Sequence, residues 1–421
     1  MFKKFWLDTI LGTLFVLLVM FGFSQLTYFK IFDVLDPIGD AFTDMETTDI
    51  VFSQIRAEPT AEEDILLVNI GMENRAGIAY MIEVINKYGP KVIAVDTFFK
   101  TPKDSIGDDL LEFAFSQVDN LILVSKLGYT QEALMSDDEN APFDTIMYSH
   151  PRFARHSKSA SANFITGASN QQDLKNCRTF APQETMADGH VENHLAVQLA
   201  MEYDPEKAEK FLARNKDIEV INYKGNVLDY GATEYNAVYF ALDVNDVYNE
   251  NFTADIVKDK IVIFCFLGNY LGDPQALEDK YFTPLNKKYA GKAHADMFGG
   301  VVHANCLSMI LNENYINSMS DNAALFWALF LLYLNVIAFS YIYKVMPKWY
   351  DGLTKLIQVI EAFALFTLVI VVFNSYDYKL EFNLAIIAIL LSGDLLEIYF
   401  GVIKNLLTKE GRRELTKLKK L

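Results

Sequence analysis

One stretch of sequence decides the fold, Asp259-Lys-Ile-Val-Ile-Phe-Cys-Phe-Leu-Gly268, and two further segments complete it. Residues 261–266 form a short apolar run with β-branched side chains, which is typical of a buried strand. Residues 279–285 (Asp-Lys-Tyr-Phe-Thr-Pro-Leu) predict an irregular loop. Residues 301–311 carry apolar side chains at helical spacing, at Val302, Cys306, Met309 and Ile310. The stretch therefore predicts a core strand, a loop and a helix packed back on a sheet.

The residues before this stretch predict more of the same sheet. Apolar runs at 64–70, 91–95 and 121–124 are predicted strands, and 77–88 and 108–117 are predicted helices. This β-α-β-α-β order requires parallel strands with right-handed crossovers. Further predictions are short hairpins in 157–167 and 179–189, a helix at 190–203, a strand at 219–223 and an edge strand at 237–242. Residues 127–187 are otherwise rich in Ser, Asn, Asp and Pro and predict a long loop. The expected class is α/β, with a mixed, mainly parallel sheet flanked by helices.

The composition adds a membrane part to this domain. The 421 residues are 51% hydrophobic and 22% charged, with a mean hydropathy of +0.12. Four apolar stretches approach the length that spans a bilayer, one N-terminal at 5–23 and three C-terminal at 323–343, 356–373 and 382–402. No small-residue cleavage site follows the first, which favours an uncleaved signal anchor. The predicted organisation is an anchor at 1–30, an exported domain at 31–320, a three-helix bundle at 321–403 and a basic tail at 404–421.

Lysine and arginine predict the orientation. They precede the first span, lie between the second and third, and follow the fourth. We therefore expect a multi-pass protein of the bacterial inner membrane, with both termini cytoplasmic and the main domain periplasmic or extracellular. Residues 24–320 hold 24 Lys and Arg against 45 Asp and Glu, a formal charge of −21. Nucleic acid is a poor partner for such a surface, because phosphate binding needs clustered cations.

Motifs for catalysis are missing from the sequence. There is no nucleophile elbow, no His-Glu-x-x-His and no paired cysteine, so we expect no enzyme activity and no cofactor. Cys177, Cys265 and Cys306 have no metal-ligand spacing and are expected to act as small hydrophobic residues, with a Cys265–Cys306 disulfide as the alternative. His294 and Asp296 lie near His303, but their spacing matches no standard zinc site.

Six segments in order resemble the extracellular sensory domain of type two that accompanies cyclases and histidine kinases, the CHASE2 family. They are Thr48-Asp-Ile-Val-Phe-Ser-Gln-Ile-Arg56, Lys87-Tyr-Gly-Pro90 with Val92-Ile-Ala-Val-Asp96, Ile221-Asn-Tyr-Lys-Gly225, Asp259-Lys-Ile-Val-Ile263 with Gly268, Asp279 with Thr283-Pro284, and Gly300-Val-Val-His-Ala-Asn305. The resemblance covers about residues 40–315. It implies a sensory role and an architecture of one span, the exported domain and three spans. Members that signal alone carry a cytoplasmic output domain, whereas residues 404–421 are too few to fold into one. The resemblance thus leads us to expect an output in a separate polypeptide.

Three residues are candidates for ligand binding. Asp96 ends a predicted strand at its carboxyl edge, where open α/β sheets bind ligands, although capping of the next turn is the alternative. His303 and Asn305 lie in the first turns of a helix after a glycine pair, and helix N-termini attract anions. The alternative for these two is that His303 bonds a core carbonyl and Asn305 orders a loop.

Three acids lie within the predicted C-terminal spans. Glu361 interrupts the third span, and Asp394 and Glu397 share one face of the fourth. Ionisable groups at this depth are costly and indicate function, and the predicted spans contain no lysine or arginine to pair with them. The preferred hypothesis is that Asp394 pairs with a cation in a partner's helix; a protonated or cavity-facing carboxyl and snorkelling are the alternatives.

The sequence therefore supports three functions. The first is a sensor or receptor subunit whose exported domain binds a ligand or protein and relays to a separate membrane or cytoplasmic partner. The second is a scaffold subunit of an envelope-spanning complex. The third is an ion-conducting component that uses Glu361, Asp394 and Glu397. In each case we expect the chain to be an oligomer or part of a complex.

Overall fold

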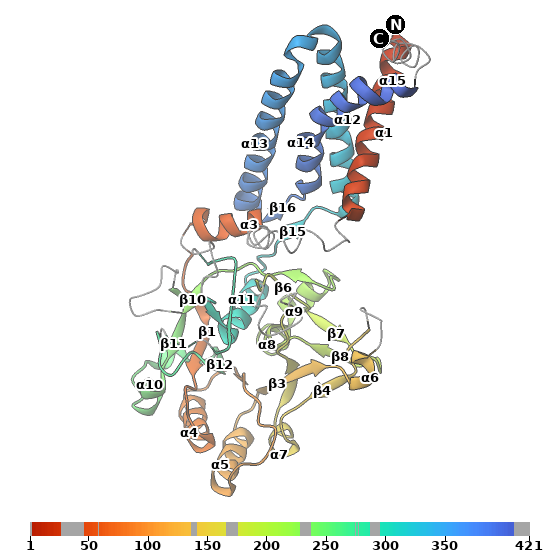
Figure 1. Cartoon of the computed structure of the whole chain (residues 1–421). Coiled ribbons are helices and arrows are strands. Elements are labelled where there is room, and N and C mark those ends of the chain that lie inside the picture. Colours follow the sequence, from red (N-terminus) through yellow and green to blue (C-terminus); the bar gives the residue numbers. More distant parts are fainter. Residues whose placement is uncertain are drawn as a thin grey trace. The chain divides into compact units, whose positions relative to one another are not determined.

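The computed structural model describes residues 2–26, 46–57, 59–135, 141–165, 176–227, 237–273, 275–276, 278–286 and 295–407. The chain divides into two compact units, each described by itself below (Figure 1). The membrane unit comprises Met1–Thr43 and Asn317–Leu421, and the α/β unit comprises Asp44–Ile316.

An eight-stranded sheet forms the centre of the α/β unit. Its main path runs β10-β11-β1-β12-β2-β3-β4, and β5 also pairs with β3. All of these pairs are parallel except β3–β4. The strands are β1 (Glu62–Asn69), β2 (Val92–Val95), β3 (Leu121–Gly128), β4 (Thr145–Met147), β5 (Lys158–Ser161), β10 (Asn226–Val227), β11 (Ala237–Leu242) and β12 (Ile261–Cys265). The predicted class, a mainly parallel α/β sheet, is confirmed.

The predicted core strand lies between β1 and β2. Every residue of β12 is buried, and its register pairs Ile263 with Leu67 on one side and Ala94 on the other. A strand covered on both faces reads as a continuous apolar run, which explains why residues 261–266 show no alternation of polar and apolar side chains.

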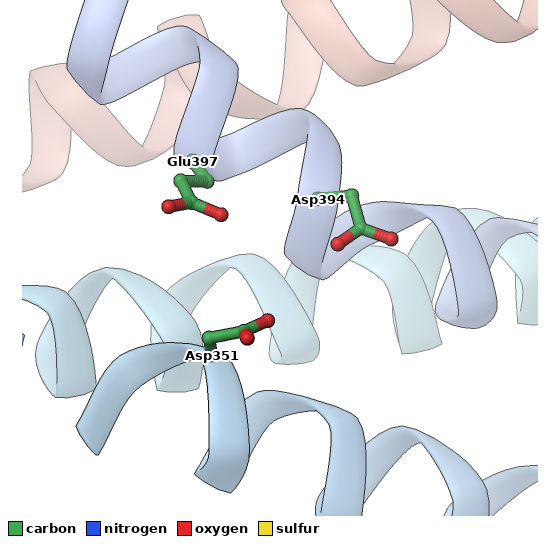
Figure 2. Close-up of side chains that lie close together, drawn as sticks. All are labelled: Asp351, Asp394 and Glu397. Carbon is green, nitrogen blue, oxygen red and sulfur yellow. The ribbon is translucent and has the colours of Figure 1, made fainter.

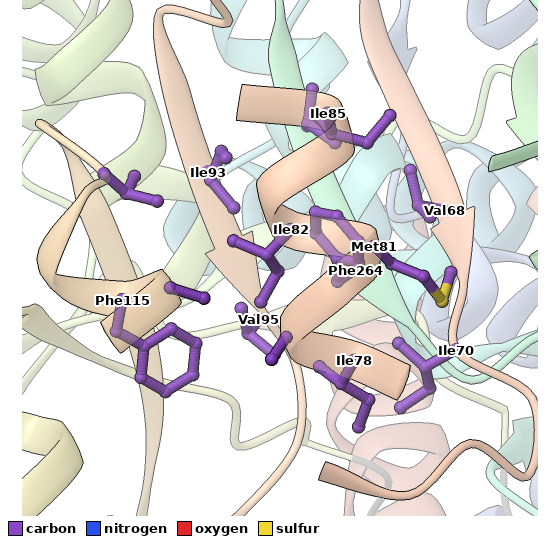
Figure 3. Close-up of a cluster of buried hydrophobic side chains, with 14 of the residues drawn as sticks. Val68, Ile70, Ile78, Met81, Ile82, Ile85, Ile93, Val95, Phe115 and Phe264 are labelled. Atoms are coloured by element: carbon purple, nitrogen blue, oxygen red, sulfur yellow. The ribbon is translucent and has the colours of Figure 1, made fainter. Parts of the chain in front are cut away.

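Helices cover both faces of the sheet. The helices α4 (Arg75–Asn86), α5 (Ser105–Ser116) and α10 (Val244–Tyr248) share one buried cluster with the strands, in which Ile82, Val95 and Phe264 meet (Figure 3). On the other face α11 (Gly299–Leu311) packs on β1 and β12, and α8 (Leu195–Tyr203) packs on β2, β3 and β5. Helix α9 (Pro205–Leu212) packs on α8 and α11. The unit thus has three layers, helix, sheet and helix.

Several sequence predictions in residues 127–242 are wrong in detail. The segment predicted as a hairpin at 157–167 contains β5, a parallel partner of β3, which its Ser-rich sequence Lys-Ser-Ala-Ser did not indicate. The predicted strand at 219–223 is only β9 (Glu219–Val220), which pairs with β6 (Thr179–Phe180) outside the main sheet. The predicted edge strand β11 is internal, because β10 pairs with its outer side.

The predicted helix at 190–203 has a different start. Residues 191–193 form β8 (Val191–Asn193), which pairs with β7 (Gln183–Thr185), so the predicted hairpin at 179–189 is displaced along the chain. The helix α8 begins at Leu195 because His194 caps it, its Nδ1 accepting from the Ala196 amide at 3.2 Å. Histidine is an uncommon cap and gave no signal in the sequence.

Short elements complete the α/β unit. They are α3 (Thr47–Ile50), the π-helical η1 (Val51–Ile55), α6 (Gln131–Leu134), α7 (Pro151–Ala154), the 3-10 helix η2 (Ala254–Ile256), and the antiparallel pair β13 (Lys280–Tyr281) and β14 (Met297–Phe298). The three cysteines are free thiols, and Cys265 and Cys306 lie in the core as predicted for small hydrophobic residues.

The membrane unit contains four helices that are long and apolar enough to cross a bilayer, one N-terminal and three C-terminal. They are α1 (Phe2–Leu26), α12 (Asp321–Val345), α13 (Tyr350–Tyr376) after the 3-10 helix η3 (Pro347–Trp349), and α14 (Asn383–Ile398), which continues as the π-helical η4 (Tyr399–Ile403) and α15 (Lys404–Leu407). A parallel pair, β15 (Asn317–Ser318) and β16 (Tyr378–Lys379), ties two connections together. The predicted tail beyond Leu407 lies outside the described residues.

Candidate functional site

Polar side chains occupy the carboxyl edge of the three central strands. Asn69 ends β1 and is fully buried, and its Oδ1 accepts from the amides of Gly71 at 3.0 Å and Leu267 at 2.8 Å. Its Nδ2 donates to the Gly268 carbonyl at 3.1 Å. Asn69 thereby fixes the chain where it leaves β12, and Gly268, with φ of +101°, makes the turn that an L side chain rarely adopts. Hydrogen bonds from Asn69 thus hold the loops in place at the carboxyl edge of the sheet, which is where α/β sheets bind ligands.

A pair of glycines brings helix α11 close to this edge. A Cβ atom at Gly300 would lie 2.4 Å from Cys265 Sγ at the end of β12, and one at Gly299 would lie 3.0 Å from Asp279 Oδ2. Both distances are closer than side chains normally approach, so glycine is required for the helix to begin where it does. The Gly299 amide donates to the Asp279 carbonyl at 2.9 Å. The double glycine thus seats the start of α11 on β12 and on the loop that carries Asp279.

Asp96 and Asp279 bring two carboxyl groups to the start of α11. Asp96 follows β2, its amide donates to the Phe264 carbonyl of β12 at 2.8 Å, and its Oδ2 lies 3.9 Å from the Cβ position of Gly300. Asp279 is held in the left-handed region with φ of +56°, which is uncommon for a residue other than glycine. Loops that are far apart in the sequence therefore converge on one helix terminus.

The two carboxyl groups share an unusual electrostatic environment. Desolvation, and to a smaller extent the negative charge of Asp279, raises the pKa of Asp96 to about 8. Desolvation also raises the pKa of Asp279 to about 6, against the effect of the Gly299 amide, which favours the charged form. Asp279 as a whole residue is exposed to solvent. Its carboxyl oxygens, however, lie against the start of α11 and lose contact with water on that side. The pair holds a proton near neutral pH in the absence of another cation.

Asp296 orders the loop beside this pair. Its Oδ1 accepts from the Thr283 amide at 2.9 Å and from Asn286 Nδ2 at 3.2 Å, and its Oδ2 accepts from the Thr283 hydroxyl at 2.6 Å. Desolvation raises the pKa of Asp296 to about 7 despite these bonds. The Thr283-Pro284 segment is therefore held by Asp296. His294, which the sequence placed near Asp296 and His303, lies outside the described residues.

His303 lies in a buried aromatic cluster rather than at the open edge. Its ring stacks on Phe164 at 4.2 Å between centroids and approaches His194 at 5.0 Å, and Phe164 in turn contacts Tyr281 at 5.1 Å. Both imidazoles are at most 2% exposed. Burial lowers the pKa of His194 to about 3 and that of His303 well below its usual range, with His194 contributing to the latter. Both histidines are therefore neutral.

Each histidine has a nitrogen without a hydrogen-bond partner among the described residues, Nε2 of His194 and Nδ1 of His303. The alternative in which His303 bonds a core carbonyl is thus not seen at Nδ1. An unbonded buried nitrogen costs free energy that a bonded one does not. Tyr281 of β13 lies two residues after Asp279 and contacts Phe164 of this cluster. Burial and the nearby charges of Asp279 and Asp96 raise the pKa of Tyr281, so this side chain links the aromatic cluster to the two acids.

Asn305 has a structural task. Its Oδ1 accepts from the amides of Lys224 at 2.8 Å and Gly225 at 3.1 Å, and its Nδ2 donates to the carbonyls of Gly225 at 2.9 Å and Val301 at 2.8 Å. The side chain is fully buried. These bonds use its polar positions to hold the Lys224–Gly225 turn, so it offers none to a ligand. The loop-ordering alternative describes this geometry, and the ligand contact does not.

Sequence reasoning missed Asp279, His194 and Tyr281 as members of the site. Asp279 stood in one of the six family-like segments, but nothing in the sequence indicated its left-handed backbone or its place beside Asp96. His194 lies 109 positions before His303 in a segment predicted as a plain helix. Only the folding of α8 against α11 brings the two rings together.

A hollow lies at the β4 end of the sheet. It has a volume of about 570 Å³ and is lined by Asp144, Tyr148, Asp188 and His190, among others. Beside it, buried Glu192 accepts from Ser125 and Ser159 at 2.8 Å each and contacts His190 Nε2 at 3.1 Å. Glu192 thus ties β3, β5 and β8 together beneath the hollow.

The intramembrane acids correct one sequence prediction. Helix α13 begins at Tyr350, not at 356, so it contains Lys355, whose Nζ lies 2.5 Å from Asp394 Oδ1 and 3.9 Å from Asp351 Oδ1. Lys355 lies one residue before the predicted span at 356–373 but within α13, so Asp394 has a partner within its own chain. Asp351, Asp394 and Glu397 are exposed and face one another from α13 and α14, with carboxyl oxygens within 4.8 Å (Figure 2).

Glu361 is separate from this cluster. Its Oε2 is buried and has no hydrogen-bond partner among the described residues. The structure thus brings Asp394 and Glu397 together, adds Asp351 and Lys355, and leaves Glu361 elsewhere on α13.

These observations define a class, a membrane protein with four apolar helices and one α/β domain inserted between the first and the second. The profile of the CHASE2 domain family matches residues 12–337. The chain belongs to the CHASE2 family, whose members are extracellular sensory domains, and the resemblance seen in the sequence is confirmed. No curated protein and no solved structure matches the chain significantly.

Proposed function

We propose that this chain is a receptor of the bacterial inner membrane, with the α/β unit outside the cytoplasm and both termini inside. Its α/β unit binds a ligand at the carboxyl edge of the sheet, and a separate protein receives the signal through the C-terminal helices. The domain acts by binding and not by catalysis. The family assignment supports the sensory role, and the positive charges beside the helix ends support the orientation.

The observation that carries the binding site is the meeting of Asp96 and Asp279 at the start of α11. Two desolvated carboxyl groups, of which the charge of Asp279 raises the proton affinity of Asp96, also favour a ligand that supplies positive charge or hydrogen-bond donors. His194 and His303 are buried in the neighbouring aromatic cluster and are not assigned a contact to this ligand. A metal ion or an organic amine is the ligand chemistry that this set accommodates.

Thermal stability of the full-length protein in detergent tests the site, because a ligand that binds only the folded state raises the unfolding midpoint. The probes are calcium, magnesium and a panel of small organic amines. At least one probe is expected to raise the midpoint in the wild type and not in Asp96→Asn or Asp279→Asn. Asp109→Asn, which removes an acid that is 70% exposed, is the matched control. An equal response in all four proteins contradicts the proposed site.

The relay to a separate partner has its own support. Asp351, Asp394 and Glu397 carry three negative charges against the one of Lys355, and all are exposed on the membrane unit. Such a surface suits a basic segment of another protein. Affinity purification in a mild detergent, followed by mass spectrometry, is expected to recover a partner in a fixed ratio, and Asp394→Asn is expected to reduce it. A homogeneous preparation of this chain alone contradicts the relay.

A further inference from the structure

The membrane unit contains a cavity that neither the sensory site nor the acidic cluster uses. It has a volume of about 330 Å³ and lies between α1, α12 and the last helical segment. Three aromatic side chains line it, Phe5, Tyr343 and Phe400. Three charged residues, Asp8, Lys344 and Lys404, and the residue Ser340 complete the wall.

The charges of the cavity do not balance. Lys404 Nζ lies 2.6 Å from Asp8 Oδ2, so these two neutralise each other and join the start of α15 to α1. Lys344 has no carboxylate partner among the described residues, and its Nζ lies 5.9 Å from the centre of the Phe5 ring. Counting the described residues, the cavity therefore carries one uncompensated positive charge beside an aromatic face.

Ser340 provides an independent sign of a missing ligand. The residue is 3% exposed, and its hydroxyl has no hydrogen-bond partner among the described residues. A serine inside a helix normally bonds the carbonyl four residues earlier when nothing else is available. A buried hydroxyl without a bond costs free energy, so the cavity wall presents a donor that lacks its acceptor.

The surroundings restrict what the ligand is. Near the cavity the helices expose large apolar side chains, including Leu7 at 57% and Val345 at 53%. Such surfaces are covered by acyl chains in a membrane. The cavity residues lie in the first turns of α1, the last turns of α12, and η4 with the first residue of α15, close to the end of the last described helix. Helix ends lie at the level of the lipid headgroups, and basic pockets there bind anionic headgroups.

We propose that this cavity binds one anionic phospholipid. Its phosphate accepts hydrogen bonds from the Lys344 ammonium and the Ser340 hydroxyl, and its glycerol and acyl parts lie against Tyr343, Phe400 and Phe5. The lipid connects the first helix with the last, next to the π-helical η4, a geometry that often marks functional sites. Occupancy therefore stabilises the four-helix unit as a whole.

Tryptophan fluorescence reports on the membrane unit separately from the α/β unit. All three tryptophans, Trp6, Trp327 and Trp349, belong to the membrane unit, so tryptophan fluorescence follows its unfolding and not that of the α/β unit. The full-length protein, stripped of lipid in a neutral detergent, is titrated with phosphatidylglycerol, with phosphatidylcholine of the same acyl chains, and with inorganic phosphate. We expect saturable stabilisation by phosphatidylglycerol alone.

Three variants separate the proposed contacts from general charge effects. Lys344→Gln is expected to weaken phosphatidylglycerol binding about tenfold, as for loss of one charge-assisted bond. Lys348→Gln removes another exposed lysine, in η3, that does not line the cavity, and is expected to bind as the wild type does. Ser340→Ala is expected to weaken binding while the lipid-free protein is at least as stable as the wild type, because an unbonded hydroxyl is removed.

Equal stabilisation by the neutral and the anionic lipid overturns the proposal, and so does equal weakening by Lys344→Gln and Lys348→Gln. Saturable binding of inorganic phosphate with the affinity of the lipid overturns the lipid assignment in favour of a free anion. If Lys344→Gln unfolds in detergent, Ser340→Ala decides alone: unchanged lipid affinity in that variant contradicts the site.

Discussion

The two units each join a pair of helices with one lysine or arginine and one aspartate, and they do so in opposite environments. In the α/β unit Arg75 of α4 binds Asp108 of α5, and their side chains are 6% and 1% exposed. In the membrane unit Lys355 of α13 binds Asp394 of α14, and theirs are 52% and 54% exposed. The same chemistry is therefore buried in one unit and lies on the surface of the other.

The difference follows from what surrounds each unit. In the α/β unit the buried pair is completed by further bonds, from Arg75 to the Thr101 carbonyl at 2.5 Å and from the Lys103 amide to Asp108 at 3.0 Å. A charge taken out of water needs all of these partners. In the membrane unit the exposed surface is largely apolar, with Phe363 at 73% and Leu18 at 69%, and the ion pair lies near a helix end. The α/β unit therefore buries its charged pair among further hydrogen bonds, whereas the membrane unit has a largely apolar surface and leaves its charged pair exposed.

The largest expected effect is at the buried pair. Asp108→Ala leaves Arg75 buried without its carboxylate and is expected to destabilise the α/β unit by about 3–5 kcal/mol. Hydrogen-exchange mass spectrometry of peptides from β2 and α5 measures the change. Asp109→Ala, next to it on the surface, is expected to change exchange little. A similar small effect for both variants would remove the contrast between the two ion pairs.

The next effect concerns glycine in each unit. Gly300→Ala places a methyl group 2.4 Å from Cys265 Sγ and is expected to cost about 1–3 kcal/mol in the α/β unit, as overpacking does. Gly352→Ala in α13 meets nothing within 4 Å and is expected to be neutral or to stabilise, because alanine favours helices. Hydrogen exchange follows the first and tryptophan fluorescence the second. A destabilisation by Gly352→Ala equal to that by Gly300→Ala contradicts the packing argument.

The acidic edge of the sheet predicts a pH dependence. The pKa of Asp96 is about 8 in the folded protein and about 3.9 in an unfolded chain, so the folded state binds the proton more tightly. This contribution to stability is complete below about pH 4 and is lost as the pH rises through 8. Asp96→Asn is expected to reduce this loss and to be more stable than the wild type at pH 8, because the amide cannot ionise. Hydrogen exchange of β2 peptides at matched intrinsic rates tests it, and an unchanged pH dependence argues against the desolvated carboxyl pair.

The smallest effect is expected at the exposed pair. Lys355→Gln and Asp394→Asn are each expected to change the stability of the membrane unit by less than about 1 kcal/mol, since exposed ion pairs contribute little. Tryptophan fluorescence during thermal unfolding measures it. A loss as large as that of Asp108→Ala would show that lipid, and not water, surrounds Lys355 and Asp394.

Much of the fold was predictable because hydrophobic pattern alone specifies it. The apolar runs at β1, β2, β3 and β12 are long enough to be recognised, and so are the four apolar helices. Strand β5 was not predictable, because Lys-Ser-Ala-Ser becomes a strand only where β3 offers an open edge. Strand β11 was found but placed wrongly, since the two-residue β10 gives no signal of its own.

The candidate site was predictable only in part. Asp96 stands out because a strand that ends in an acid lies at a known edge of the sheet. Asn305 looked similar, but three of its four hydrogen bonds depend on the position of the Lys224–Gly225 turn, about 80 residues away along the chain. Short-range pattern cannot show which polar groups are already bonded.

The sequence by itself determined the two units, the central strands and the family, because these depend on local periodicity and the order of segments. The tertiary structure alone decided which polar side chains meet: Asp279 with Asp96, His194 with His303, and Lys355 with Asp394. The physical reason is the separation along the sequence over which each kind of interaction acts. Apolar burial is specified by spacing along a few turns of chain, whereas a bond between two polar side chains depends on loops and helix contacts that join distant parts of the sequence.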